Sequence, residues 1–214
     1  GCTHANEAGP CDDGDACSSG DTCAAGVCAG VSISSQCPVL SVCNTGSVSI
    51  PSSGNATPYP SDIAVAGVTY VSKVTVALKG VGHTFPSDID VLVVGPVTTK
   101  NIVVMSDTGG GTQTPVVGGV DLTFDDAAAG PLPNTVPLAG GVNGTFKPTN
   151  LAGTDTFSAP APAQSGATAL STFHGTNPTG TWSLYVNDDA AGDLGSFAGG
   201  WCVNITHPCT SDAE

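Results

Sequence analysis

The chain has 214 residues, including 29 Gly and 16 Pro, and only 10% of its side chains are charged. Its 18 acidic residues and four lysines give a formal net charge of −14. So few cations cannot neutralise phosphate groups, which excludes a nucleic-acid binder and a protein that docks on anionic lipid. The near absence of Glu, Lys and Arg also excludes a charged helical bundle and favours an all-β chain.

The cysteines indicate an oxidising compartment, so we expect an extracellular protein, either secreted or on a cell surface. No C-x-x-C pair occurs, which argues against zinc and for disulfides with one sulfur left over. The chain begins at Gly1, so we expect a removed signal peptide or a fragment. The longest apolar run, residues 91–97, is far too short to span a bilayer. The nine cysteines are Cys2, Cys11, Cys17, Cys23, Cys28, Cys37, Cys43, Cys202 and Cys209.

Residues 1–30 hold five cysteines and almost no large apolar side chain, so cross-links must hold this segment together. Its sequence C-D-D-G-D-A-C-S-S-G-D-T-C-A-A-G-V-C resembles the small disulfide-knotted repeats of secreted proteins. We predict a disulfide-stapled head at residues 1–44, a β-sandwich at 45–209 and a short tail at 210–214.

Period-2 alternation of apolar side chains begins after the head and predicts strands. Within residues 70–80, Val74, Val76 and Leu78 share one face, while Lys73 and Lys79 lie on the other. Residues 89–95 are apolar on both faces, which is typical of a central, covered strand. Further strands are expected at 101–107 and 121–124.

Two more strands are predicted near the C-terminus, after a proline-rich loop at 158–166 and a single helical turn at 169–175. Residues 181–187 place Trp182 and Leu184 on one face, and residues 199–206 do the same with Trp201 and Val203. Cys202 then faces away from the core. We predict a disulfide from this strand to the region of Cys37 or Cys43; a local bridge between Cys202 and Cys209 is the alternative.

Five blocks in order carry a resemblance: G-V-G-H-T-F-P-S-D-I-D-V-L-V-V-G-P, V-M-S-D-T-G-G-G-T, L-T-F-D-D-A-A, F-K-P-T-N and N-P-T-G-T-W-S-L-Y-V-N-D-D-A-A-G-D-L-G-S-F-A-G-G-W. Over about residues 45–206 the chain resembles the proprotein-convertase P-domain-like modules of secreted bacterial proteins. The resemblance implies a jelly-roll-like β-sandwich without catalytic residues of its own. In that family the module follows a subtilisin-like protease or decorates cell-surface proteins.

Acidic residues cluster at predicted strand ends, where converging carboxylates need a cation, and calcium is the expected ion. The first group lies at the mouth of the strand at 89–95 and in the Gly-rich loop after the strand at 181–187. A second group lies at other strand ends in blocks that match the family. The alternative for both groups is that the carboxylates cap turns. The first group is Asp88, Asp90, Asp188, Asp189 and Asp193, and the second is Asp107, Asp125 and Asp126.

No nucleophile and base stand in a recognisable pattern, so we predict that the chain is not an enzyme. We interpret His83 as a structural residue rather than a base. Three N-x-S/T sequons, at Asn55, Asn143 and Asn204, are candidate glycosylation sites.

The sequence favours a non-catalytic structural or adhesive subunit that polymerises with copies of itself into a surface filament. The odd cysteine and the scarcity of Lys to guard sheet edges support that expectation. The alternative is the accessory P-domain of a secreted subtilisin-like protease, released from its catalytic domain or lacking one.

Overall fold

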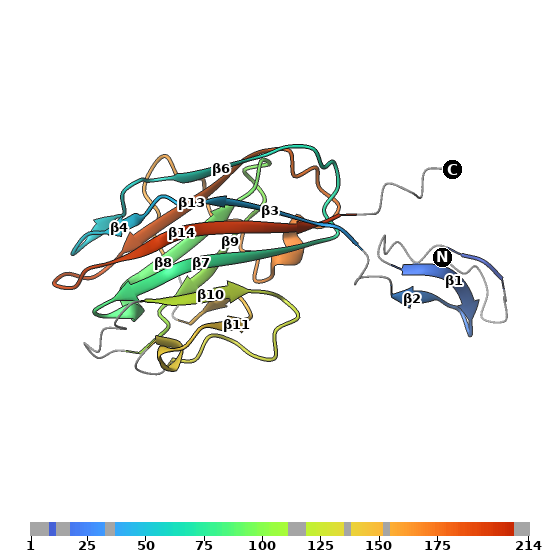
Figure 1. The fold of residues 1–214 in the computed structure, drawn as a ribbon, viewed down its shortest axis with the longest axis horizontal. Helices are drawn as coiled ribbons and strands as arrows, with labels where there is room; N and C mark the ends of the chain where they lie inside the picture. The colour runs from blue at the N-terminus through green and yellow to red at the C-terminus, as the bar shows by residue number, and fades with distance from the viewer. Residues whose placement is uncertain are drawn as a thin grey trace.

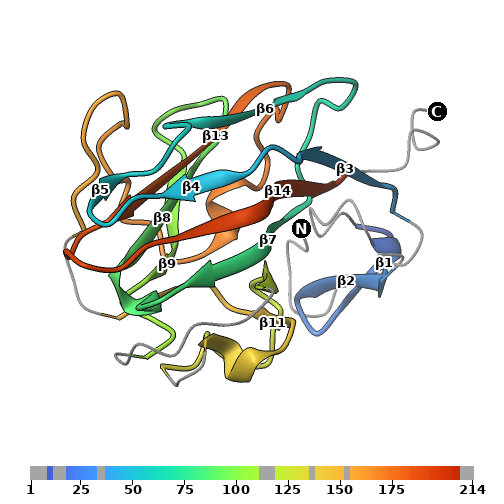
Figure 2. The ribbon, with the colours of Figure 1, turned by 60° about the vertical axis from the view of Figure 1, so that its left-hand side comes forward.

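The computed structural model describes residues 9–11, 18–32, 37–110, 119–134, 138–151 and 155–207. In this part of the chain, two six-stranded sheets pack against each other (Figures 1 and 2). The first sheet has the order β11 (Gly144–Phe146), β10 (Val120–Phe124), β7 (Lys73–His83), β14 (Gly195–Thr206), β3 (Val39–Asn44), with β4 (Val48–Ile50) also paired to β14. The second has the order β12 (Thr149–Asn150), β9 (Asn101–Ser106), β8 (Ile89–Val94), β13 (Gly180–Asp188), β5 (Gly54–Asn55), with β6 (Ser61–Val65) also paired to β13.

Helical structure is limited to three short 3-10 turns among the described residues: η1 (Pro86–Asp88), η2 (Leu138–Gly141) and η3 (Leu170–Phe173). No helix in the described ranges is long and apolar enough to cross a membrane. The predicted all-β, jelly-roll-like sandwich with a disulfide-rich N-terminal module is confirmed.

The core lies between the two sheets and is built by the alternation in the sequence. Val74, Val76 and Leu78 of β7 are each at most 1% exposed, as predicted. Trp182 of β13 and Trp201 of β14 are fully buried from opposite sheets. The large aromatic and branched side chains of both inner faces therefore form one continuous apolar cluster.

The second sheet is also covered on its outer face. Leu92 and Val94 of β8 pack there with Val103 and Tyr185, under partly buried side chains that include Phe157. β8 lies between β9 and β13 and is buried at every position. The prediction of a central strand covered on both faces is confirmed.

A disulfide joins β3, the earliest strand of the first sheet in the chain, to β14, the last. Cys43 of β3 lies directly opposite Cys202 of β14, with 4.0 Å between their Cα atoms, and the two are bonded. This is the expected link to the Cys37 or Cys43 region, so the local Cys202 to Cys209 bridge does not form. β3 therefore belongs to the sandwich, which begins before the boundary predicted at residue 45.

The head contains a two-stranded antiparallel sheet, β1 (Ser18–Ala24) and β2 (Val27–Ser32), drawn in blue in Figure 1. A disulfide from Cys11 to Cys28 ties the segment before β1 to β2. Cys23 and Cys37 are also disulfide-bonded. The remaining cysteines, Cys2, Cys17 and Cys209, lie outside the described residues.

Candidate metal centre

Three aspartates from three separate segments meet at one end of the second sheet. Asp90 lies in β8, Asp107 follows β9 directly, and Asp155 follows β12. One carboxylate oxygen from each lies within 4.8 Å of the other two. Among the described residues, this is the group of acidic, His or Cys side chains whose geometry suits a metal ion.

Strand pairing brings these residues together. β8 and β9 are antiparallel with Val91 opposite Met105, so Asp90 comes beside the end of β9. β12 runs parallel to β9 with Asn150 opposite Ser106, so the chain after β12 leaves the sheet at the same end. Asp155 reaches the other two carboxylates from that side.

Ser106 is the hydroxyl at the centre of the group. Its Oγ lies 2.9 Å from Asp107 Oδ2 and 2.7 Å from Asp155 Oδ1, and it also bonds the Asp90 carboxylate. A serine hydroxyl has a single proton to donate, so it can satisfy one of the three carboxylates at a time. The other negative charges require a proton or a cation.

The need for a proton or a cation is strongest at Asp90, because this side chain is buried and only 2% exposed. Its pKa is raised to about 8, first by burial and then by the charges of Asp155, Asp189 and Asp107, while the Ser106 bond lowers it. A pKa this high means that the environment destabilises the ionised carboxylate. A nearby cation would stabilise that ionised form.

A second acidic set, Asp88 and Asp188, lies around the buried His83, beside the group of three aspartates. His83 Nε2 lies 3.1 Å from Asp188 Oδ2, and Nδ1 accepts from the Phe85 N–H at 3.2 Å. This ring therefore fastens β7 to the end of β13, in agreement with a structural role. Burial raises the pKa of Asp88 to about 6, and the charges of Asp188 and Asp189 add to the shift.

Asp189 connects the two sets. Its backbone N–H donates to the Asp88 carbonyl at 3.0 Å. Its own pKa is raised by burial and then by the charges of Asp107 and Asp155. Asp193, which is 8% exposed, adds to the repulsion at Asp88. All five carboxylates of the first predicted group therefore belong to one acidic end of the sandwich, and Asp90 alone of them is in the group of three.

The structure divides the second predicted group. Asp107 joins Asp90, whereas Asp125 pairs with Lys73 at 2.8 Å. Asp126 accepts the N–H groups of Leu170 and Ser171, each at 2.8 Å. Asp125 Oδ1 also accepts the Ala127 N–H at 2.9 Å, so both carboxylates bond to backbone N–H groups of turns, as in the turn-capping alternative. Asp155 was not predicted, because it stands alone in a Gly and Thr stretch with no acidic neighbour in the sequence.

The donor set decides which ions fit. Three carboxylates and a hydroxyl are hard oxygen ligands, and they suit Ca²⁺, Mg²⁺ or a similar divalent cation rather than a thiolate-preferring metal. Asp107 has a positive φ of 53°, a conformation that Asp tolerates better than most residues, and it aims its carboxylate at this point.

The three sequon asparagines occupy different environments. Asn55 Nδ2 donates to Ser158 Oγ at 2.7 Å, and Asn204 Nδ2 donates to Thr75 Oγ1 at 3.1 Å. Asn143 is exposed, and its Oδ1 accepts the Asp121 N–H at 2.8 Å.

No family model matches this chain, and no curated protein matches it either. Two similar solved structures contain the serine protease of Aeromonas sobria. In the complex of that protease with its chaperone, the matched chain is 15% identical with a TM-score of 0.40, and the match covers 80% of this chain and 27% of that chain. For the protease structure without the chaperone, the identity is 14% and the TM-score 0.39, with 79% and 26% covered. This chain thus spans about a quarter of the chains that it matches.

Proposed function

We propose that the chain is a non-catalytic extracellular module that binds calcium at one end of its β-sandwich and acts as an accessory, P-domain-like unit. The observation that carries the proposal is the convergence of Asp90, Asp107 and Asp155 around the single hydroxyl of Ser106. Calcium accepts six to eight oxygen ligands, which three carboxylates, a hydroxyl and water supply. The five sequence blocks that resemble P-domain-like modules support the accessory role.

The cation's part is structural. It would neutralise carboxylates on β8, after β9 and after β12, and would thereby tie together three segments that are distant in sequence. A cation that binds only the folded state stabilises it by about 2.7 kcal/mol at a hundredfold excess over Kd.

The contacts of His83 support a non-catalytic role. The ring is 2% exposed and bonds to Phe85 and Asp188 rather than to a hydroxyl nucleophile. We expect no hydrolysis of casein or of ester substrates by the purified chain, with calcium or with a chelator. Turnover that persists through purification would overturn the non-catalytic part of the proposal.

Calcium titration by calorimetry tests the metal site. We expect one strong site per chain in the wild type, and at least about a tenfold loss of affinity in Asp107→Asn, equivalent to about 1.4 kcal/mol. Asp62→Asn is the matched control, because Asp62 accepts from Ser183 on β13 and is not in the group of three. Equal affinity in all three proteins would overturn the site.

A self-associating subunit of a surface filament is the second candidate function. The observation that favours it is the edge strand β3, whose residues Val39–Asn44 include no charged side chain and alternate between exposed and partly buried. An uncharged sheet edge is open to pairing with another copy. Sedimentation in calcium distinguishes the two: the accessory module stays monomeric, and the subunit forms large species as the concentration rises.

A further inference from the structure

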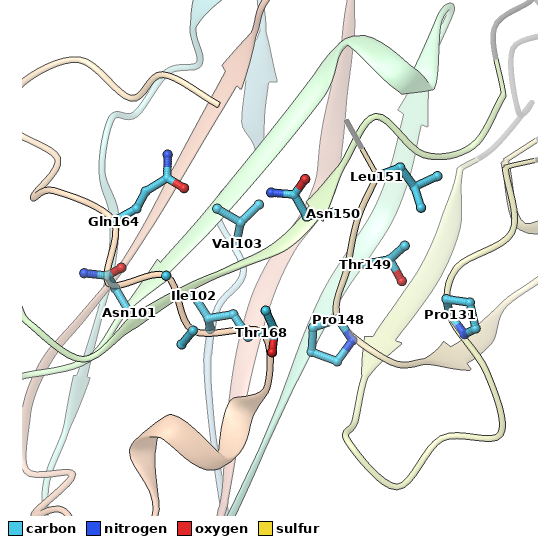
Figure 3. Close-up of a pocket in the computed structure, with 12 residues that line it drawn as sticks. Asn101, Ile102, Val103, Pro131, Pro148, Thr149, Asn150, Leu151, Gln164 and Thr168 are labelled. Carbon is cyan, nitrogen blue, oxygen red and sulfur yellow. The ribbon is translucent and has the colours of Figure 1, made fainter. Parts of the chain in front are cut away.

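A pocket of about 520 Å³ lies along the outer edge of β9, beside the group of three aspartates. Its floor is Asn101, Ile102 and Val103. Figure 3 shows residues 148–151 along one wall of the pocket, with Gln164 and Thr168 on the segment along the other wall. The volume falls within the range of ordinary ligand sites.

The lining is uncharged, although the chain as a whole carries a net charge of −14. Aliphatic surface comes from Val103, Pro148 and Leu151, and polar groups come from Asn150, Gln164 and other amide or hydroxyl side chains. Among the described residues that line the pocket none is aromatic, so they offer no flat platform for a sugar ring. These features favour a neutral ligand that has both apolar groups and hydrogen-bond donors.

Both walls are already partners of the β9 edge. Ala167 bridges Ile102 in parallel, and Thr149 pairs with Met105 in parallel. Between these two points, no pairing of the described residues covers Val103 or Val104 on that side. The edge of β9 therefore pairs with extended backbone on either side of Val103 and Val104, and the pocket lies beside these two residues. Addition of a peptide strand to a sheet edge is a common mode of recognition.

The two wall amides are oriented by one residue, Asp155. Asn150 Nδ2 donates to Asp155 Oδ2 and Gln164 Nε2 donates to the Asp155 carbonyl, each at 2.6 Å. Figure 3 shows these two side chains on either side of Val103. Because their N–H₂ groups face Asp155, their carbonyl oxygens remain to accept from a ligand. Asp155 is also one of the three carboxylates of the metal centre.

We propose that this pocket binds an extended, uncharged peptide, and that the cation controls the affinity by fixing Asp155 and, through it, both walls. The second half rests on the proposed calcium site. A cation held by Asp90, Asp107 and Asp155 orders the residue to which both walls are bonded, so peptide and cation favour each other's binding.

The test uses the full chain and a capped, uncharged peptide, acetyl-Ser-Val-Thr-Val-Ser-amide, followed by backbone amide NMR. In calcium we expect shifts at the floor and walls, at residues 101–104, 149–151 and 166–168. With chelator the peptide affinity should fall at least about fivefold, the lower end of ordinary coupling between sites. Calorimetry with calcium alone is run in parallel, so the metal site is scored separately.

Variants separate the pocket from the cation. Thr168→Trp places an indole in the pocket from an exposed wall residue that does not bond Asp155, so it should abolish peptide binding and leave calcium affinity unchanged. Thr145→Trp, at an exposed position on β11, is the matched control. Asp155→Asn should weaken both ligands.

Each of the following results would overturn a different part of the proposal. Calcium binding without peptide shifts overturns the peptide site and leaves the proposed function standing. Shifts with maltotriose but not with the peptide overturn the peptide assignment in favour of a carbohydrate. Equal peptide affinity in calcium and chelator overturns the coupling, and the absence of any calcium heat overturns the proposed function itself.

Discussion

Asp90 shows at the scale of one residue how this fold creates a demand for a cation. It lies in a strand that is buried at every position, and the exposed fraction of Asp90 itself is 2%. Its nearest charges are other carboxylates. An ionised group in such a place is costly unless it is paired, so the carboxylate destabilises the cation-free fold and stabilises the cation-bound one.

Asp90→Asn should therefore act in opposite directions with and without calcium. Without calcium we expect the free energy of unfolding at neutral pH to rise by about 1 kcal/mol or more, because the buried Asp90 carboxyl must take up a proton when the chain folds at this pH, whereas Asn need not. With calcium the variant should lose most of the stabilisation that the wild type gains. Chemical unfolding in chelator and in calcium measures both effects.

Asp121→Asn is the matched control for that prediction. Asp121 accepts the Gly80 N–H and pairs with Lys79 at 3.0 Å, and these contacts lower its pKa. The pair is partly exposed, so its loss should destabilise the fold by up to about 1 kcal/mol in either buffer. A stabilised Asp121→Asn, or an Asp90→Asn that is destabilised in chelator, would contradict this account.

The pH dependence follows from the two raised pKa values. Burial raises the pKa of Asp90 to about 8 and that of Asp88 to about 6 in the folded chain, from an ordinary value of 3.8. Between these limits the folded state binds more protons than the unfolded state, so the unfolding free energy of the calcium-free protein falls as the pH rises from about 4 to about 8. The stability that these two protonated carboxyls contribute is fully present below their pKa in the unfolded chain, and it is lost above their pKa in the folded chain.

Bound calcium needs ionised ligands, so its stabilising effect should grow across the same window. Urea unfolding at several pH values, with calcium and with chelator, measures the two curves. They should diverge as the pH increases, and parallel curves would refute the link between these carboxylates and the cation.

The sequence predicts part of this site for a physical reason. Asp88, Asp90 and the acids of residues 188–193 lie at the ends of strands that the sequence marks clearly, by an apolar run at 89–95 and by alternation at 181–187. Their convergence could therefore be expected from strand pattern alone. Asp155 could not be expected, because its position depends on the pairing of the two-residue strand β12 with β9. Such a short strand has no detectable period.

At the scale of the elements, β3 shows why the boundary between the head and the sandwich could not be predicted from the sequence. The strands at 89–95 and 181–187 have buried faces that force a clear pattern. β3 is an edge strand of alternating exposed and partly buried residues, and it follows a cysteine-rich stretch, so the sequence pattern alone favours the head. Its register on β14 and its disulfide place it in the sandwich.

Replacing Cys43 and Cys202 together by Ala should destabilise the sandwich markedly. The bridge closes a sequence separation of 159 residues, and chain-entropy models give about 3 to 5 kcal/mol for large loops. We expect a loss of at least about 2 kcal/mol in guanidinium unfolding, with the fastest new hydrogen exchange in β3. An unchanged unfolding midpoint would show that the pairing of β3 does not depend on the disulfide.

The pairing of β14 with β7 shifts register between Phe197 and Gly200, and this irregularity offers a second test at the scale of the elements. Gly200 has φ of 70°, and a Cβ there would meet the Asn44 carbonyl of β3. Gly54 in β5 has φ of 91° but open space around it. Gly54→Ala should cost about 1 kcal/mol through backbone strain, and Gly200→Ala clearly more, because β3 must also move. Equal losses in thermal unfolding would contradict the close approach of β3.

At the scale of the whole molecule, the sandwich has its own core and should not require the head. Deleting residues 1–37 keeps β3 and its disulfide, whereas deleting residues 1–44 removes both. We expect the longer deletion to be less stable than the shorter one by about 3 kcal/mol, most of it from the lost cross-link. Two truncated proteins of equal stability would show that β3 contributes nothing to the sandwich.

The acidic end gathers carboxylates from two strands of the second sheet and from the segments that join strands at that end, so a single cation there would hold several distant parts of the chain together. The most direct measurement is a crystal structure of the full chain grown in calcium. We expect one density peak bonded to Asp90, Asp107 and Asp155 at calcium–oxygen distances of about 2.3 to 2.6 Å. A structure at high calcium with no peak there, or with the ion held only by Asp88, Asp188 and Asp193, would contradict it.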